Sequence, residues 1–323
     1  MTSMMLLSES DLVATNLSFD EILALVEQTY ALQAGGDVEV PTKIGVHPAY
    51  PKSFLHAMPA WVGGDAPSLG MKWISYYPGN VSRGLPDSTG VILLNDPHNG
   101  QPICMMEGMY ITFLRTAACA AVAAKHLVHE PKTLGLVGCG GLGKWSLRFM
   151  CHAFPSLDTV YVTSKKPESR REFCETADVP NCRVIPVDHP REAVADSDIV
   201  VTSVPPNDMP PVESGFLREG SLFIPLDIVN SWSPAALADF DRFVVDNVEA
   251  FPSLLKRKLG HEGMDLGSFV SMQQMIASSI SPANTGDRIF VGVCGIASID
   301  IAIAWTMYQR AKQSNSGASF QMR

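Results

Sequence analysis

The feature that most constrains the fold of this chain is a glycine-rich segment near its middle, Gly138-Cys139-Gly140-Gly141-Leu142-Gly143. It fits the pattern G-x-G-x-x-G. It directly follows a short apolar run at 134–137, and a segment with helical character follows it. A strand, a glycine turn and a helix in this order are the context in which the pattern binds a dinucleotide. The alternative is a glycine-rich turn that binds nothing.

Each glycine of the pattern has a distinct expected task. Gly138 permits the tight turn, Gly140 lets the backbone approach a pyrophosphate, and Gly143 lets the helix pack closely on the strand. The N–H groups at the start of the following helix attract the phosphates. Other residues that we expect around the cofactor are Gly141 and Leu142 in the turn, and Ser203 after a later strand.

Apolar runs alternate with helical segments from residue 133 onward. The runs lie at 160–162, 184–187, 199–203, 222–226 and 242–246. Strands that alternate with helices at this spacing indicate an α/β fold with a parallel sheet. We therefore predict a Rossmann-type, doubly wound dinucleotide-binding domain over residues 131–294.

The first 130 residues have a different pattern. Ser18 and Glu21 form a capping box before a helix predicted over 18–34. Short apolar runs separated by Pro and Gly follow up to residue 106, and an alanine-rich helix is expected over 111–128. We predict a mixed α+β domain over 1–130, completed by the C-terminal segment 295–323, which begins with a helix and ends in a polar tail.

Composition excludes several classes of protein. The net charge of −9 argues against a general nucleic-acid binder. None of the seven cysteines is spaced C-x-x-C, so we expect reduced thiols and no metal site. The N-terminus does not resemble a signal peptide, and no run of about 18 apolar residues is present to span a membrane. We therefore expect a cytoplasmic protein.

The cofactor preference depends on the residues after the second strand of the predicted sheet. An Asp or Glu about 20 residues after the glycine turn marks an NAD ribose. This chain has Thr163, Ser164, Lys165 and Lys166 at that tip, so hydroxyl and ammonium groups are available for a 2′-phosphate. We expect NADP(H), with NAD(H) as the alternative and an exposed, uninvolved lysine pair as the non-functional interpretation.

Several motifs, taken in order, resemble the ornithine cyclodeaminase/mu-crystallin family. They are Phe54-Leu55-His56-Ala57-Met58-Pro59-Ala60, Met71-Lys72, Pro78-Gly79-Asn80, Arg115-Thr116-Ala117-Ala118, Ser197-Asp198-Ile199-Val200-Val201-Thr202, Asp227, and Gly295 with Asp300. The resemblance implies a homodimer. It also implies that the N-terminal domain contacts the substrate and that the Rossmann domain binds a nicotinamide cofactor. Members include cyclodeaminases, alanine dehydrogenases, opine-type dehydrogenases and reductases of cyclic ketimines.

The resemblance also implies roles for individual residues. Lys72 and Arg115 match positions that hold the substrate carboxylate, and Lys43 stands where relatives usually have Arg. Asp227 matches the carboxylate that faces the substrate nitrogen. His56 stands where the cyclodeaminases have a Glu credited with acid–base work, and this departure argues against ornithine cyclisation. The implied catalytic residues are Asp227, Lys72 and His56.

Each of these residues also has a structural interpretation. Lys72 fits an edge-strand lysine, Arg115 a buried partner of a structural carboxylate, and Asp227 the cap of a turn. Lys43 fits a solvated side chain and His56 a core histidine. Asp300 is expected to be structural, orienting a neighbour or capping the last helix.

The favoured function is an NAD(P)H-dependent reductase of a cyclic imino acid such as pyrroline-2-carboxylate or piperideine-2-carboxylate, or the reverse amino acid dehydrogenase. One alternative is an ornithine or lysine cyclodeaminase with tightly held NAD+. Another is a non-catalytic, crystallin-like binding protein. The expected partner is a small carboxylate-bearing imine or amino acid, with no nucleic acid and no membrane.

Overall fold

The computed structural model describes residues 3–179, 181–205, 211–228, 230–259, 269–279, 284 and 286–322. The chain forms two compact units, residues 1–115 with 296–323 and residues 116–295. The division falls within helix α3 (Met109–Leu127), whereas the sequence suggested a boundary after this helix, near residue 130.

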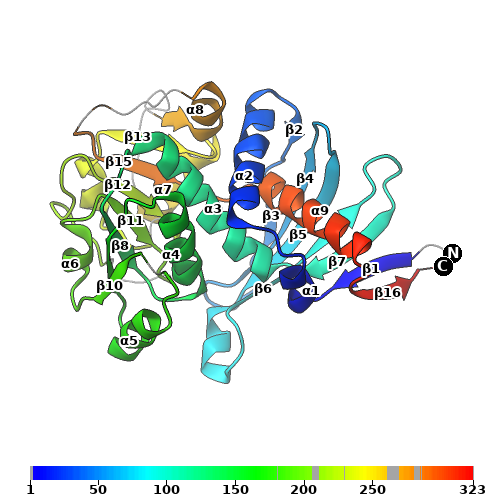
Figure 1. The fold of residues 1–323 in the computed structure, drawn as a ribbon, viewed down its shortest axis with the longest axis horizontal. Helices are drawn as coiled ribbons and strands as arrows, with labels where there is room; N and C mark the ends of the chain where they lie inside the picture. The colour runs from blue at the N-terminus through cyan, green and yellow to red at the C-terminus, as the bar shows by residue number, and fades with distance from the viewer. Residues whose placement is uncertain are drawn as a thin grey trace. The chain divides into compact units, whose positions relative to one another are not determined.

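The first unit is built on one large sheet (Figure 1). Its strands run in the order β16-β1-β7-β6-β5-β4-β2, with β3 paired to β4. All pairs are antiparallel except β1 with β7. The strands are β1 (Ser3–Leu7), β2 (Val38–Glu39), β3 (Ile44–Val46), β4 (Phe54–Val62), β5 (Ser68–Tyr76), β6 (Ser88–Asn95), β7 (Pro102–Glu107) and β16 (Ala318–Gln321).

Helix α9 (Ala297–Gln313) packs on one face of this sheet, against β4, β5 and β6. Helices α1 (Glu9–Ala14) and α2 (Phe19–Ala34) pack against α9 in turn, and a 3-10 helix, Pro78–Arg83, follows β5. Strand residues that face α9 are buried, among them Met58, Lys72 and Ile92, which lie side by side across three strands. The C-terminal helix therefore belongs to the core of the first unit.

The second unit contains a sheet in which every strand pair is parallel. Its order is β10-β9-β8-β11-β12-β15-β13-β14. The strands are β8 (Thr133–Val137), β9 (Thr159–Thr163), β10 (Arg183–Pro186), β11 (Ile199–Thr202), β12 (Leu222–Pro225), β13 (Arg242–Val245), β14 (Phe269–Ser271) and β15 (Ile289–Gly292). The prediction of a Rossmann-type doubly wound sheet plus a mixed α+β domain is confirmed.

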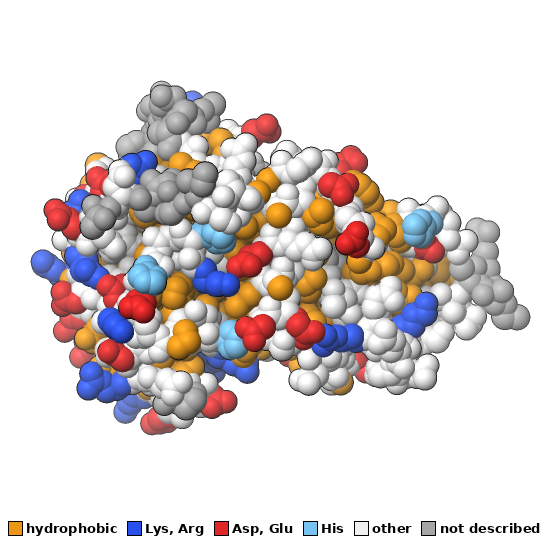
Figure 2. Space-filling view, turned by 45° about the horizontal axis from the view of Figure 1, so that its top comes forward, with side chains coloured by type: hydrophobic (Ala, Val, Ile, Leu, Met, Phe, Trp, Pro, Cys, Tyr) orange, Lys and Arg blue, Asp and Glu red, His pale blue; other side chains and the backbone are white. Residues whose placement is uncertain are grey.

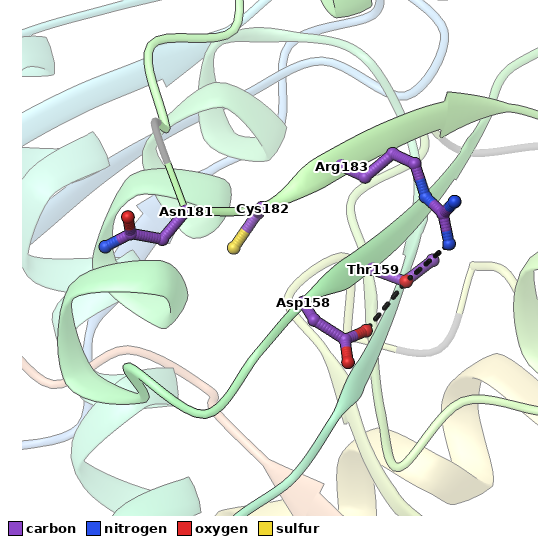
Figure 3. Close-up of a pocket in the computed structure, with 5 residues that line it drawn as sticks. All are labelled: Asp158, Thr159, Asn181, Cys182 and Arg183. Carbon is purple, nitrogen blue, oxygen red and sulfur yellow. Dashed lines mark hydrogen bonds between the residues drawn. The ribbon is translucent and has the colours of Figure 1, made fainter.

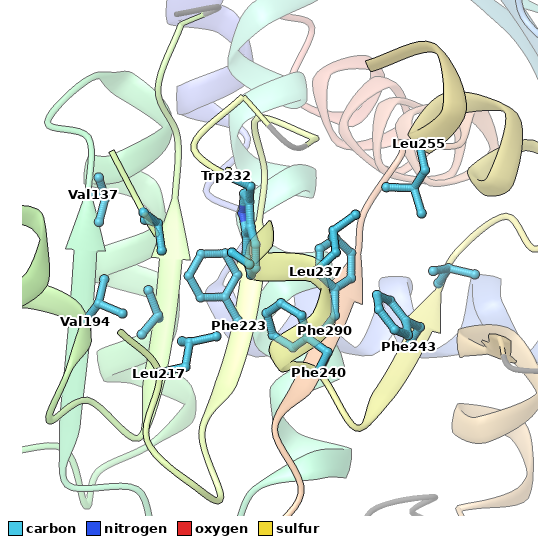
Figure 4. Close-up of a cluster of buried hydrophobic side chains, with 14 of the residues drawn as sticks. Val137, Val194, Leu217, Phe223, Trp232, Leu237, Phe240, Phe243, Leu255 and Phe290 are labelled. Carbon is cyan, nitrogen blue, oxygen red and sulfur yellow. The ribbon is translucent and has the colours of Figure 1, made fainter. Parts of the chain in front are cut away.

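The helices of this unit connect successive strands (Figure 1). They are α4 (Gly141–Ala153), α5 (Pro167–Glu175), α6 (Pro190–Val194), α7 (Ala250–Leu259) and α8 (Met272–Ser278), with a 3-10 helix at Pro234–Asp239. The core centres on a row of phenylalanines, because Phe223, Phe290, Phe243 and Phe269 are register partners on four adjacent strands. Trp232 packs edge-on against Phe223 with ring centroids 3.9 Å apart (Figure 4).

The structure differs from the sequence prediction at the C-terminus. The segment expected to be a polar tail forms β16, which pairs antiparallel with β1. Every residue of β16 is exposed, so it lacks the alternation of buried and exposed positions by which a strand is recognised in a sequence. Backbone pairing with a distant edge strand explains its formation.

The described residues were searched for membrane-spanning helices and for clusters of metal-binding side chains. No helix among them combines the length and apolar character needed to cross a membrane, and no three His, Cys, Asp or Glu side chains among them gather as a metal site. On the face seen in Figure 2, Lys and Arg side chains are interspersed with Asp and Glu.

Candidate functional site

The glycine turn of the second unit requires glycine at Gly138. Its φ of +124° lies in a region that other residues rarely adopt, and a Cβ there would lie 2.6 Å from the carbonyl oxygen of Ser203. The Gly138 N–H donates to the carbonyl oxygen of Thr163 at 2.9 Å. The turn is thereby held between the ends of β9 and β11.

Gly140 and Gly143 differ in what surrounds them. A Cβ on Gly143 would lie 2.2 Å from the Gly138 carbonyl oxygen, so the helix packs against the turn. A Cβ on Gly140 would meet no atom within 4 Å. Gly140 is the N-cap of α4 and makes no side-chain capping bond, which leaves the first turn of the helix open to an anion. These residues fit the pyrophosphate of a dinucleotide.

The turn lies where the strand order of the parallel sheet reverses. Strand β8 has β9 on one side and β11 on the other, and the chain passes from β8 outward in both directions. Ligands of such sheets bind outside the carboxyl ends of the strands at this point. Three of the predicted cofactor positions, Gly138, Thr163 and Ser203, are together there.

The tip of β9 contains a contact that the sequence interpretation missed. Ser164 is half-buried and Lys165 is exposed. The buried guanidinium of Arg170, on α5, donates to the Ser164 carbonyl oxygen at 2.6 Å and also forms an ion pair with Asp188, which is almost fully exposed. A carboxylate therefore lies near this tip, supplied by the segment after β10. The signal was present, because Asp188 follows the neighbouring parallel strand by two residues.

Asp227 lies at the same edge of the sheet, two residues after the end of β12. Its carboxylate accepts hydrogen bonds from the Val204 N–H at 3.0 Å and from the Ser231 hydroxyl at 3.2 Å. Burial raises the pKa of Asp227, and these hydrogen bonds act in the opposite direction. The next residue, Ile228, has φ +70°, which is unfavourable for a β-branched side chain and indicates a turn held in place by its surroundings.

The first unit buries two cations against one carboxylate. Lys72 on β5 donates from Nζ to Asp300 Oδ2 at 2.7 Å, and Arg115 on α3 donates from Nε to Asp300 Oδ1 at 3.0 Å. Lys72 and Asp300 are 1% and 0% exposed, and Arg115 is 6% exposed. Lys72 lies on a central strand, between Met58 and Ile92, so the edge-strand interpretation is wrong. Asp300 is the orienting carboxylate that the sequence allowed.

His56 and Lys43 lie on the same face of the sheet as Lys72. Met58 is the register partner of Lys72, and His56 follows Met58 by two positions toward the start of β4, so its side chain points to the same side. The His56 ring stacks on Phe54 with centroids 4.1 Å apart and lies over Gly45, where a Cβ would approach its Cδ2 to 2.4 Å. Lys43 is exposed, immediately before β3, and extending the register of β3 with β4 places it opposite Met58.

The positive charges act on one another through this face. Burial, then repulsion by Arg115, lowers the pKa of Lys72 from its ordinary 10.5 to about 8, with a smaller effect from Lys43, while Asp300 opposes the shift. Lys72, Arg115 and Asp300 together have one net positive charge. A buried cluster of this kind is suited to bind a small anion such as a carboxylate.

Comparison with known proteins identifies the family. The family model for "Ornithine cyclodeaminase/mu-crystallin family" matches residues 1–226. The chain belongs to this family. The predicted resemblance is confirmed.

Its relatives include the nodulation efficiency protein NfeD of Rhizobium meliloti, 31% identical over 96% of each chain. N-((2S)-2-amino-2-carboxyethyl)-L-glutamate dehydrogenase of Staphylococcus aureus is 29% identical over 82% of this chain and 81% of its own. Δ1-Pyrroline-2-carboxylate reductase of Thermococcus litoralis, solved with NADH and L-proline, superposes with a TM-score of 0.88 at 26% identity, covering 98% and 99% of the two chains. Two of these relatives, a dehydrogenase and a reductase, are oxidoreductases. This is the enzyme class that the sequence analysis predicted for the chain.

The lowered pKa of Lys72 predicts a specific pH dependence of stability. Between about pH 8 and 10.5 the unfolded chain keeps a proton on Lys72 that the folded protein has lost, so the free energy of unfolding should rise with pH. The full effect is about 3 kcal/mol. Lys72→Met should lack this contribution, as urea unfolding at a series of pH values will show.

Lys132, which is exposed, provides the matched control. Lys132→Met is expected to follow the wild-type pH dependence. Identical pH profiles for the wild type and Lys72→Met would show that Lys72 titrates in the folded protein as it does in the unfolded chain.

Proposed function

We propose that this protein is an NAD(P)H-dependent reductase of a cyclic α-imino acid, such as pyrroline-2-carboxylate or piperideine-2-carboxylate, or the corresponding amino acid dehydrogenase in the reverse direction. The observation that carries the proposal is the buried cluster of Lys72, Arg115 and Asp300. Asp300 contacts both cations, and a substrate carboxylate would bind to the same pair. The family membership and the pyrroline-2-carboxylate reductase relative support the same substrate class.

Lys72 and Arg115 bind and orient the substrate carboxylate in this proposal. Arg115 offers a planar guanidinium and Lys72 a compact ammonium, so the two cations can hold both carboxylate oxygens. Asp300 fixes both cations before the substrate arrives, which lowers the cost of ordering them on binding. Lys43 adds positive charge beside the same face and attracts the anion.

The cofactor residues proposed are the glycine turn with Gly138, Gly140, Gly141, Leu142 and Gly143, and Thr163, Ser164, Lys165 and Ser203 around it. A bound nicotinamide cofactor supplies or accepts the hydride. Asp227 is proposed to stabilise the substrate nitrogen as it becomes positively charged, or to exchange a proton with it. Its raised pKa suits that task, because a buried carboxyl with a raised pKa takes up a proton more readily. His56 is the second candidate for proton exchange.

A kinetic experiment tests the carboxylate-binding role. Charge-assisted hydrogen bonds contribute about 1.5–3 kcal/mol each, and about 1.4 kcal/mol is a factor of ten in rate. We therefore expect Lys72→Met and Arg115→Ala each to lower kcat/KM for pyrroline-2-carboxylate at least about tenfold. Arg115→Lys should restore only part of the activity, because an ammonium lacks the two-pronged geometry of guanidinium.

The ester of the same imine is the control substrate, since it lacks the anion. It should react poorly with the wild type, and neither substitution should change its rate much. Full activity of Lys72→Met with the acid, or equal rates for acid and ester in the wild type, would contradict the proposal. Consumption of NADH or NADPH with the cyclic imine also separates a reductase from a cyclodeaminase, which shows no net cofactor turnover, and from a non-catalytic binding protein.

The preferred cofactor is proposed to be NADP(H), since Ser164 and Lys165 supply a hydroxyl and a cation at the tip of β9. Asp188 opposes this preference, because its carboxylate repels a 2′-phosphate, although its ion pair with Arg170 screens that charge. We expect the wild type to have a higher kcat/KM with NADPH than with NADH. Lys165→Ala combined with Ser164→Asp should make kcat/KM higher with NADH than with NADPH. Asp188→Asn should increase the ratio of kcat/KM with NADPH to kcat/KM with NADH. Better use of NADH by the wild type would contradict the proposal.

A homodimer is proposed from the face of the first sheet that points away from α9. Ile44, Ala57, Trp73 and Val91 form one row across β3, β4, β5 and β6 on this face. Ile44 is 70% exposed and Trp73 42%, which is an apolar surface of the kind that association buries.

Sedimentation equilibrium should therefore give twice the chain mass of 35.0 kDa. Trp73→Asp should shift the protein toward the monomer. Val13→Asp, which places the same charge at an exposed apolar position on α1, should leave the dimer intact. A wild type that is monomeric at micromolar concentration would refute the dimer.

A further inference from the structure

Two cysteines of the second unit lie in contact, away from the glycine turn. Cys151 is in the last turn of α4 and Cys182 immediately precedes β10. Their sulfur atoms are 3.0 Å apart. The Cys182 thiol also donates a hydrogen bond to the Leu157 carbonyl oxygen at 3.3 Å. Both residues are half-buried, and both are free thiols. The sulfurs are therefore close enough to bond after a small movement, because a disulfide has its sulfurs about 2 Å apart.

Cys182 also lines a surface pocket of about 520 Å³ with Asp158, Thr159, Asn181 and Arg183 (Figure 3). The Thr159 hydroxyl donates to Asp158 at 2.7 Å, and Arg183 donates to Thr159 at 3.4 Å. The lining of the pocket thus includes a carboxylate, an amide and a guanidinium besides the thiol. These groups complement the carboxylates and amine of a small peptide thiol such as glutathione.

The two thiols differ in their access to a reagent. Cys151 does not line the pocket, and burial, then its contact with Cys182, raises its pKa above the ordinary value. A thiol that keeps its proton is a poor nucleophile. A molecule in the pocket therefore meets Cys182, and the Cys151 sulfur lies 3.0 Å from the Cys182 sulfur.

We propose that Cys151 and Cys182 form a reversible disulfide by exchange with a small disulfide of the glutathione class, which enters at the Cys182 pocket. The Cys182 thiolate attacks one sulfur of oxidised glutathione, which gives a mixed disulfide and releases one reduced glutathione. Cys151 then loses its proton, attacks the Cys182 sulfur and displaces the second glutathione. The protein thiols give up two electrons and two protons, and one glutathione disulfide becomes two thiols.

The bond would stabilise the second unit without altering the cofactor turn. It ties the end of α4 to the start of β10 and closes the loop 151–182, which restricts the unfolded chain. The glycine turn is at the opposite end of α4, about 16 Å from Cys151 at 1.5 Å per helical residue. Cofactor affinity is therefore expected to be the same for the oxidised and reduced proteins.

The test is incubation of the full-length protein with oxidised glutathione, followed by intact-mass measurement and peptide mapping. The wild type should lose the mass of two hydrogen atoms, yield one linked peptide containing Cys151 and Cys182, and gain several degrees in Tm. Dithiothreitol should reverse all three changes. Mapping of the wild type needs no variant and so does not depend on the folding of any substituted protein.

Variants separate the proposed role of Cys182, which forms the mixed disulfide, from that of Cys151, which displaces the second glutathione. Cys151→Ser should accumulate one glutathionyl group on Cys182, and Cys182→Ser should leave Cys151 unmodified. Cys174→Ser, a partly buried cysteine on α5, should form the disulfide as the wild type does. A stable mixed disulfide on the wild type, a link between other cysteines, or glutathionylation of Cys151 in Cys182→Ser would overturn the proposal.

Discussion

The buried carboxylate of Asp300 is the group on which the first unit depends most. It accepts one hydrogen bond from Lys72 and another from Arg115, and all three side chains are almost completely removed from water. Removing one member of a buried charge cluster leaves the others uncompensated, at a cost of about 3–5 kcal/mol. Because Asp300 lies on α9 and Lys72 on β5, the same contact fixes how the last helix packs on the sheet. Under the proposed function, the same two cations that hold Asp300 would also bind the carboxylate of the substrate.

The second unit depends on backbone geometry more than on charge. Within the glycine turn, a side chain at Gly138 or Gly143 would collide with the main chain, whereas the space around Gly140 is open. The turn thereby brings the uncapped start of α4 to the carboxyl edge of the sheet, where Thr163, Ser203 and Asp227 also lie. The row of phenylalanines across β12, β15, β13 and β14 supports this edge from within the sheet. Chemistry-bearing residues on loops are thus positioned by a rigid apolar core.

The tip of β9 illustrates how a local interpretation of cofactor choice can be incomplete. The residues after β9 alone suggest a phosphate-binding site. The buried Arg170 guanidinium joins that tip to Asp188, which comes from the neighbouring strand, so cations and a carboxylate lie close together. Under the proposed cofactor assignment, the charges of Lys165 and Asp188 would act in opposite directions on a 2′-phosphate, and the ion pair with Arg170 would screen part of the Asp188 charge.

The sequence alone determined the features that depend on neighbouring residues. The glycine turn, the alternation of strands and helices, the capping box at Ser18 and Glu21, and the buried alanine-rich helix α3 follow from local backbone requirements and from the periodicity of apolar residues. Only the tertiary structure decided which distant side chains meet. Lys72 and Asp300 are 228 positions apart, Cys151 and Cys182 are 31 apart, and β16 forms only because β1 offers an unpaired edge. Such contacts depend on strand register and on how a helix packs, and a shift of one residue in a strand would turn Lys72 to the opposite face of its sheet.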